Sequence, residues 1–148
     1  FAAISHYIDS KGGICEPYIA PFAVFLNEDD KNYVEPDIAV ICDPEKLTDR
    51  GCTGAPDWII EIVSPSSRRM DYLTKLLKYS SSGVREYWMK YQNAGVREYW
   101  IVDPDKKQIM VYDFVNNDMR QYTFADSVKV GIYEDFCIDF AEITKDLF

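Results

Sequence analysis

The run WIIEIV at residues 58–63 is apolar at five of its six positions, and it limits the folds open to this chain. Strands buried on both faces have such continuous apolar runs, whereas half-exposed strands alternate apolar and polar residues. The run therefore predicts a strand in the middle of a sheet that is covered on both sides. Glu61 interrupts it, and a buried carboxylate costs several kcal/mol unless something compensates it. We therefore expect Glu61 to have a partner, a metal ion or a role in a reaction.

The rest of the chain predicts helices and further strands around this central strand. Ile4 and Ile8 are at helical spacing ahead of Gly12-Gly13, which indicates the end of a helix. Strands are expected in the apolar segments 14–26, 33–42, 99–115 (a hairpin), 120–124 and 127–133. A polar loop is expected through Gly51 and Gly54, a helix from about Arg69, and a last helical turn near the end of the chain. This order predicts an α/β (α+β) fold, with one mixed β-sheet flanked by helices.

Length and composition predict a single soluble domain over residues 1–148. No apolar run approaches the roughly 20 residues that span a bilayer, and no signal-peptide pattern opens the chain. The chain starts at Phe1 without a methionine, so we expect an N-terminal segment to be missing. The four cysteines show no CxxC spacing, which favours reduced thiols in a cytoplasmic protein over a zinc site.

The net charge of −9 argues against a nucleic-acid partner, but its distribution is uneven. Residues 68–98 carry seven basic and three acidic side chains, a net charge of +4, whereas the segments on both sides are acidic. Arg68, Arg69 and Lys78 in this segment are candidate nucleic-acid-binding residues. The alternative is a solvated basic helix on an acidic protein.

Two carboxylates on predicted neighbouring strands form a candidate metal site. Alternation along a strand places Asp37 on the same face as Ala39 and Ile41, and Glu61 on the same face as Ile59. Converging carboxylates repel each other unless a cation lies between them, and hard oxygen ligands select Mg²⁺ or Mn²⁺. Such an ion suits phosphodiester cleavage. The alternatives are a structural ion pair for Glu61 and a turn or strand-start role for Asp37.

The predicted helix after Glu61 offers further polar groups. Asp71, Lys75 and Tyr79 are spaced four residues apart and share one helix face. Lys75 could stabilise charge on a scissile phosphate, with Asp71 and Tyr79 as possible supporting residues. The alternative is an Asp71–Lys75 surface pair, worth only about 0.3–0.5 kcal/mol.

A tandem repeat follows this segment. KYSSSGVREYWM at 78–89 and KYQNAGVREYWI at 90–101 match at 8 of 12 positions. Two copies are too few for a solenoid. The second copy runs into the hairpin and is expected to be the strand, so the first copy is an insertion that is not an equivalent strand.

Together, EPDIAVI, GAPDWIIEIVSPSS, D-x3-K-x3-Y, GVREYWIVDP and QIMVYDF resemble the "putative restriction endonuclease" family, also called the Uma two family, of the PD-(D/E)xK nuclease superfamily. The resemblance runs from about Cys15 to Phe148. It implies a restriction-endonuclease-like fold and cleavage of DNA with Mg²⁺ or Mn²⁺. Asp37 matches the PD aspartate and Glu61 the acidic position of the motif. Val63 stands where the superfamily has lysine, and within the family Lys75 supplies that group instead.

Two functions remain open from the sequence. The first is a Mg²⁺-dependent endonuclease that uses Asp37, Glu61 and Lys75, acts on DNA and forms a homodimer. The second is a catalytically inactive relative that serves as a DNA-binding or assembly module. The acidic net charge favours the second, whereas the presence of all three site residues favours the first.

Overall fold

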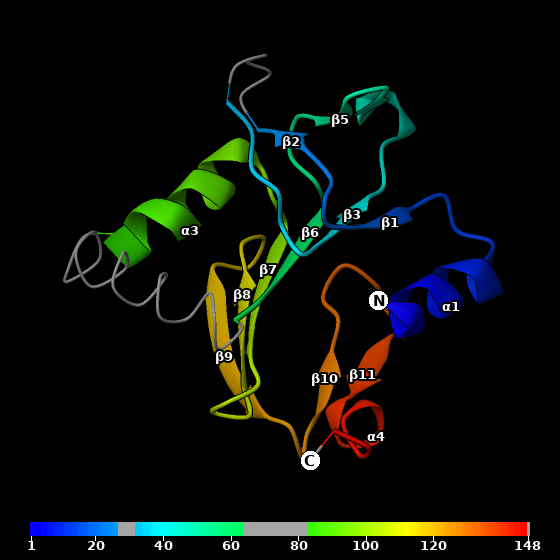
Figure 1. Ribbon diagram of the computed structural model, residues 1–148, viewed down its shortest axis with the longest axis vertical. Helices are drawn as coiled ribbons and strands as arrows, with labels where there is room; N and C mark the ends of the chain where they lie inside the picture. Colours follow the sequence, from blue (N-terminus) through cyan, green and yellow to red (C-terminus); the bar gives the residue numbers. More distant parts are fainter. Residues whose placement is uncertain (27–31, 64–82, 148) are drawn as a thin grey trace.

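The computed structural model of the protein describes residues 1–26, 32–63 and 83–147, with the backbone alone over 83–88. Its main feature is a six-stranded mixed sheet in the order β1-β3-β6-β7-β8-β9 (Figure 1). These strands are β1 (Glu16–Ile19), β3 (Ile38–Ile41), β6 (Trp58–Ile62), β7 (Glu98–Asp103), β8 (Gln108–Asp113) and β9 (Asp118–Thr123). The predicted α+β class and mixed sheet are thereby confirmed.

Shorter elements surround this sheet. The helices are α1 (Ala2–Lys11), α3 (Gly83–Ala94) and α4 (Phe140–Ile143), with a 3-10 turn at Pro44–Lys46. Two small sheets are formed by β2 (Val24–Phe25), β5 (Gly51–Thr53) and β4 (Leu47–Thr48), and by β10 (Ser127–Lys129) and β11 (Cys137–Asp139). Among the described residues, no helix has both the length and the apolar character needed to cross a membrane.

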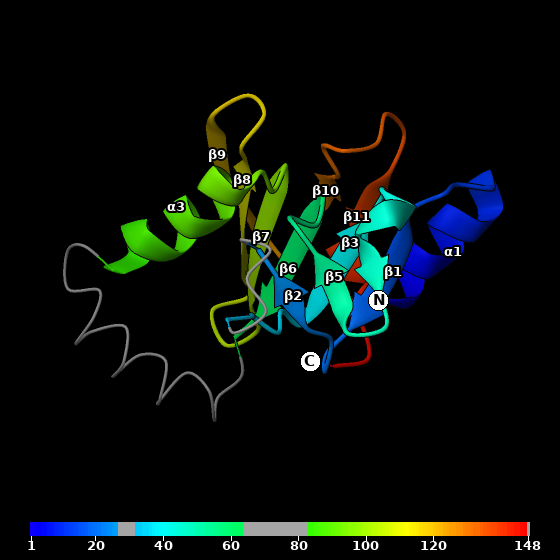
Figure 2. The same ribbon diagram turned by 90° about the horizontal axis from the view of Figure 1, so that it is seen from above.

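The central sheet is covered on both faces, as the apolar run in β6 predicts. Trp58 and Ile60 pack on one face into a cluster that includes residues of α1, β10, β11 and α4. Ile59 packs on the other face into a cluster that includes residues of β2, β5 and α3. Figure 2 shows α3 and α1 at opposite ends of the view, with the sheet between them. The side chains of Trp58, Ile59 and Ile60 are at most 5% exposed.

The helix α1 ends as its sequence predicts. Gly12 is its C-cap in the left-handed conformation, with φ 61°. Glycine adopts this conformation without the steric cost that other residues meet, which is why it commonly ends helices. The buried residues of the helix are Ile4 and Ile8, the pair whose spacing predicts the helix.

The predicted polar loop through Gly51 is wrong in part, because β4 and β5 form there. Gly51 lies in β5 with φ 135°, and a Cβ atom at this position would lie 2.1 Å from the carbonyl oxygen of Ala23. Glycine is therefore required for both the backbone conformation and the close approach to the chain ahead of β2. Glycine, proline and aspartate are depleted in strands and surround these short strands, so composition alone hides this small sheet.

The expectation of four reduced cysteines is also wrong. Cys15 and Cys42 form a disulfide, whereas Cys52 and Cys137 are free. In the β1–β3 pair, Glu16 lies opposite Ile41, so one further step along both strands brings Cys15 opposite Cys42. The two cysteines are 27 residues apart in sequence, so only the strand pairing brings them together.

The two copies of the repeat adopt different structures, as predicted. The sequence GVREYW lies within α3 at 83–88, whereas at 95–100 it turns and enters β7. The second copy supplies buried residues to the core: Tyr91, Val96, Glu98, Tyr99 and Trp100. The second copy is therefore part of the core of the described structure.

Deleting residues 78–89 is expected to leave the protein folded. The deletion removes one whole repeat, so Leu77 is again followed by a Lys-Tyr pair and the second copy keeps its place in the core. We expect the free energy of unfolding to change by less than about 1 kcal/mol, so the melting temperature should shift by no more than about 2–4 °C. Circular dichroism melts measure this. An unfolded or aggregated deletion variant would show that the first copy has a structural role.

Candidate active site

Asp37 and Glu61 lie on neighbouring segments of the central sheet, Asp37 directly before β3 and Glu61 within β6, which agrees with the prediction of adjacent strands. β3 and β6 pair antiparallel with Ile38 opposite Ile60 and Ala39 opposite Ile59. Continuing this register by one residue places Asp37, which directly precedes β3, opposite Glu61. Side chains alternate along a strand, so both carboxylates share the face of Ala39 and Ile59. Asp37 Oδ2 accepts a hydrogen bond from the backbone N–H of Ile62 at 2.6 Å, which ties it to the end of β6.

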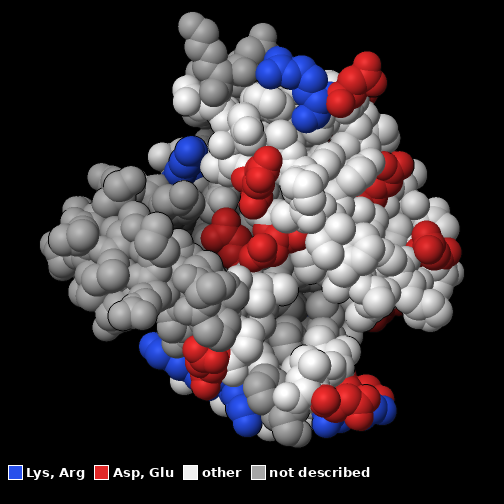
Figure 3. Space-filling view, viewed as in Figure 1, with Lys and Arg blue, Asp and Glu red and all other residues white. Residues whose placement is uncertain are grey.

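The carboxylate of Glu61 lies at a pocket and is held by two tyrosines. The Tyr91 hydroxyl donates to Oε1 at 2.9 Å and the Tyr99 hydroxyl donates to Oε2 at 3.0 Å. Among the described residues, the pocket is lined by Tyr33, Val34, Glu35, Glu61 and Tyr91, and its volume is about 460 Å³. Figure 3 shows acidic side chains gathered near the centre of the face turned toward the viewer.

The chemistry of these carboxylates fits a Mg²⁺ or Mn²⁺ ion. Such ions take oxygen ligands, and proteins hold Mg²⁺ through one or two carboxylates while water fills the other positions. A carboxylate has about four lone-pair sites and can accept hydrogen bonds while it also binds an ion, so the hydrogen bonds to Asp37 and Glu61 are compatible with metal binding. No cluster of three or more His, Cys, Asp or Glu side chains suited to a metal occurs in the described part of the chain. The candidate site is therefore a carboxylate pair.

The remaining predicted site residues lie outside the described residues. They share the segment between β6 and α3: Arg68, Arg69, Asp71, Lys75, Lys78 and Tyr79. The helix predicted from about Arg69 lies there as well. The structure therefore positions the carboxylate pair, and Lys75 stays a prediction from sequence.

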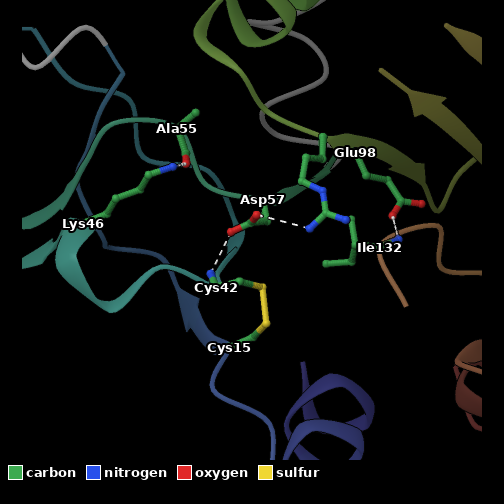
Figure 4. Close-up of polar contacts among 8 residues, drawn as sticks. Cys15, Cys42, Lys46, Ala55, Asp57, Glu98 and Ile132 are labelled. Atoms are coloured by element: carbon green, nitrogen blue, oxygen red, sulfur yellow. Dashed lines mark hydrogen bonds and ion pairs between the residues drawn. A yellow bond between two sulfur atoms is a disulfide. The ribbon is translucent and has the colours of Figure 1, made fainter. Parts of the chain in front are cut away.

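Asp57, which belongs with Glu61 to the segment GAPDWIIEIVSPSS, has a structural role. Asp57, just before β6, accepts a hydrogen bond from the backbone N–H of Cys42 at 2.7 Å and pairs with Arg97 at 3.4 Å (Figure 4). Its backbone carbonyl also accepts from the N–H groups of Arg97 and Glu98. Asp57 thus joins the end of β3 to the start of β7, and so fixes the strands that flank Glu61.

Glu98 is the one buried charged side chain among the described residues, at 2% exposure. It accepts hydrogen bonds from Trp100 Nε1 at 3.0 Å, from the N–H of Gly131 at 2.9 Å and from the N–H of Ile132 at 3.1 Å. Figure 4 shows the contact between Glu98 and Ile132. Burial raises the pKa of Glu98 more than these hydrogen bonds lower it. Glu98 therefore anchors the loop after β10 to the central sheet.

The raised pKa of Glu98 predicts a pH-dependent stability difference. An acid whose pKa is higher in the folded state loses stability as the pH rises through that pKa, whereas glutamine does not titrate. We expect the stability of the parent protein relative to Glu98→Gln to fall as the pH rises above the ordinary pKa of a glutamate, about 4. Thermal melts of both proteins at increasing pH test it. A constant difference, or one that grows with pH, would contradict the assignment.

Sequence reasoning missed the two tyrosines that hold Glu61. Tyr99 was detectable in principle, because it pairs with Ile59 across the parallel β6–β7 contact and so shares the face of Glu61. Tyr91 occupies the same repeat position as Tyr79, the residue predicted to support the site. The repeat thus pointed to a tyrosine at this position, and in the described residues Tyr91 is the copy observed at Glu61.

Comparisons with known proteins identify the family and the fold of the chain. Residues 1–90 match the Uma2 family, described as "Putative restriction endonuclease". A crystal structure described as "a putative nuclease belonging to DUF820", from Anabaena variabilis ATCC 29413, has the same fold, with a TM-score of 0.63 and 19% sequence identity. The similarity covers 95% of this chain and 75% of that chain. No curated protein matches the chain. The match includes β3, β6 and both candidate carboxylates, and the protein belongs to the Uma2 family.

Proposed function

We propose that the protein is a divalent-metal-dependent endonuclease that hydrolyses phosphodiester bonds in DNA. The observation that carries this proposal is the family match over residues 1–90, because it spans both strands that bear the carboxylates. The pairing of β3 with β6 supports it further, since it directs Asp37 and Glu61 to one face of the sheet. The pocket beside Glu61 offers room for a ligand.

In this proposal Asp37 and Glu61 hold Mg²⁺ or Mn²⁺. Once bound, the ion supplies Lewis-acid chemistry: it polarises a phosphoryl oxygen and lowers the pKa of water. The backbone N–H of Ile62 orients Asp37 through the hydrogen bond to Oδ2. Lys75 places a positive charge at the scissile phosphate and stabilises the charge that develops there. Asp71 and Tyr79 would support Lys75 from the same helix face.

DNA is the proposed substrate, and it would be held through its phosphates. Arg68, Arg69 and Lys78 belong to the one segment of the chain with net positive charge. Each phosphate contact releases counterions, so binding through these residues weakens as salt rises. The acidic remainder of the protein would keep DNA away from other surfaces, because like charges repel.

We further propose that the protein acts as a homodimer. Cutting both strands of a duplex at one place takes two copies of a single nuclease site, and two-fold dimers are the commonest soluble assemblies. Sedimentation equilibrium gives the mass of the particle directly. A monomer mass with and without DNA would contradict the dimer and leave the nuclease proposal in place.

A plasmid cleavage assay tests the proposed function. Supercoiled plasmid and single-stranded DNA are incubated with the purified protein in Mg²⁺, in Mn²⁺ and in EDTA. We expect nicked and linear products with either metal and intact DNA in EDTA. Intact DNA under all conditions would contradict the proposal.

That negative result would favour the second candidate, a catalytically inactive relative that binds DNA or assists assembly. The observation that favours it is the net charge of −9, which is unusual for a protein that must approach DNA. A DNA-binding titration at low and high salt then distinguishes a DNA-binding module from one that binds no DNA.

A further inference from the structure

The two tyrosines at Glu61 come from different elements and converge on one carboxylate. Tyr91 lies in α3 and Tyr99 in β7, on either side of the turn at Gly95. Their side chains are 0% and 3% exposed, and their rings meet edge to face with centroids 4.8 Å apart. Tyr99 also stacks with Tyr112 at 5.9 Å. The ring positions are therefore set by packing, which leaves each hydroxyl little freedom to move.

Each hydroxyl contacts a different oxygen of Glu61. Tyr91 donates to Oε1 and Tyr99 to Oε2, so the carboxylate plane is held at both ends. Hydrogen bonds to an ionised acceptor are stronger than those between neutral groups. Groups that orient a metal-binding carboxylate in this way typically change metal affinity when they are removed, by about 10–100-fold.

Both tyrosines belong to the second copy of the repeat. Tyr91 and Tyr99 correspond to Tyr79 and Tyr87 of the first copy. Two hydroxyls that contact Glu61 therefore come from the second copy. Lys75 stands four residues before Tyr79 but 16 residues before Tyr91.

We propose that Tyr91 and Tyr99 are positioning residues that hold the Glu61 carboxylate for a divalent ion, and that the second copy of the repeat is the one that serves the site. This inference rests on the proposed function. A purely structural role for the tyrosines makes a different prediction: their hydroxyls would stabilise the fold and leave metal affinity unchanged.

Calorimetric titration with Mn²⁺ distinguishes the two roles without relying on cleavage. Tyr91→Phe and Tyr99→Phe keep the packed rings and remove one hydroxyl each. We expect each to weaken Mn²⁺ binding by about 10–100-fold. Cleavage should then require more metal but recover toward the parent rate at saturating Mn²⁺. Unchanged Mn²⁺ affinity in both variants would overturn the inference.

Two controls make the same chemical change elsewhere. Tyr112→Phe alters a buried tyrosine that stacks with Tyr99, and Tyr87→Phe alters the first-copy counterpart of Tyr99. Both are expected to bind Mn²⁺ with the parent affinity. A loss in Tyr87→Phe as large as in Tyr99→Phe would overturn the assignment to the second copy.

Mn²⁺ binding by a Glu61→Gln variant distinguishes a failure of this inference from a failure of the proposed function. Mn²⁺ binding that is lost in Glu61→Gln but unaltered in both tyrosine variants overturns the inference alone. A parent protein that binds no Mn²⁺ overturns the proposed function, and the inference with it.

Discussion

Glu61→Gln is expected to abolish divalent-dependent DNA cleavage while the protein stays folded. The substitution keeps the shape of the side chain but removes the charge that would hold the ion. The fold should survive, because the hydroxyls of Tyr91 and Tyr99 can accept from the new amide as well as donate to its oxygen. Removing a half-buried charge should also reduce the cost of burial. Plasmid cleavage with Mg²⁺ and a thermal melt, on the same preparation, measure both effects.

Glu98→Gln is the matched control for this experiment. It makes the same change at a carboxylate whose observed partners are Trp100 and two backbone N–H groups. We expect this variant to keep metal-dependent cleavage at temperatures where it is folded. Equal loss of cleavage in both variants would show that the effect is not specific to the candidate site. Full activity in Glu61→Gln would remove Glu61 from the proposed mechanism.

Lys75→Ala is expected to slow cleavage strongly and to leave metal binding intact. Lysine would act on the phosphate and not on the ion, so its loss should remove charge stabilisation in the transition state. Loss of one such group typically costs about 10²–10³-fold in rate. Cleavage rates at saturating Mg²⁺ measure this effect, and calorimetry should show Mn²⁺ affinity close to that of the parent protein.

Lys106→Ala serves as the control for Lys75→Ala. Lys106 lies exposed in the turn between β7 and β8, so its loss removes the same charge far along the chain from the proposed site. We expect the parent cleavage rate in this variant. If Lys75→Ala behaved like Lys106→Ala, the predicted role of Lys75 would be wrong, and its alternative as part of a surface pair with Asp71 would be favoured.

Local patterns predicted the central elements well, because burial leaves a strong signal in the sequence. The apolar run of β6 and the helical spacing of Ile4 and Ile8 both reflect side chains that are removed from water. The same alternation predicted that Asp37 and Glu61 would lie on adjacent strands and share a face. Periodicity works here because one face, or both, of each element is in contact with the core.

The features that sequence reasoning missed depend on contacts between distant segments. Cys15 and Cys42 meet only because β1 pairs with β3. GVREYW forms helix in one copy and enters a strand in the other; this difference was predicted from the position of the second copy ahead of the hairpin, because local propensity alone cannot decide it. Tyr91 in α3 contacts Glu61 in β6, a contact between residues 30 positions apart in the sequence. In each case tertiary packing chooses between structures that the local sequence allows.

Crystals soaked in Mn²⁺ would test the central claim most directly, because anomalous scattering locates the metal without any assay. The claim is that Asp37 and Glu61 together hold one divalent ion. It predicts an anomalous peak bonded to a carboxylate oxygen of each residue, and no such peak in Glu61→Gln crystals treated in the same way. A Mn²⁺ ion bound elsewhere, or an empty carboxylate pair in crystals that hold Mn²⁺ at other positions, would contradict it.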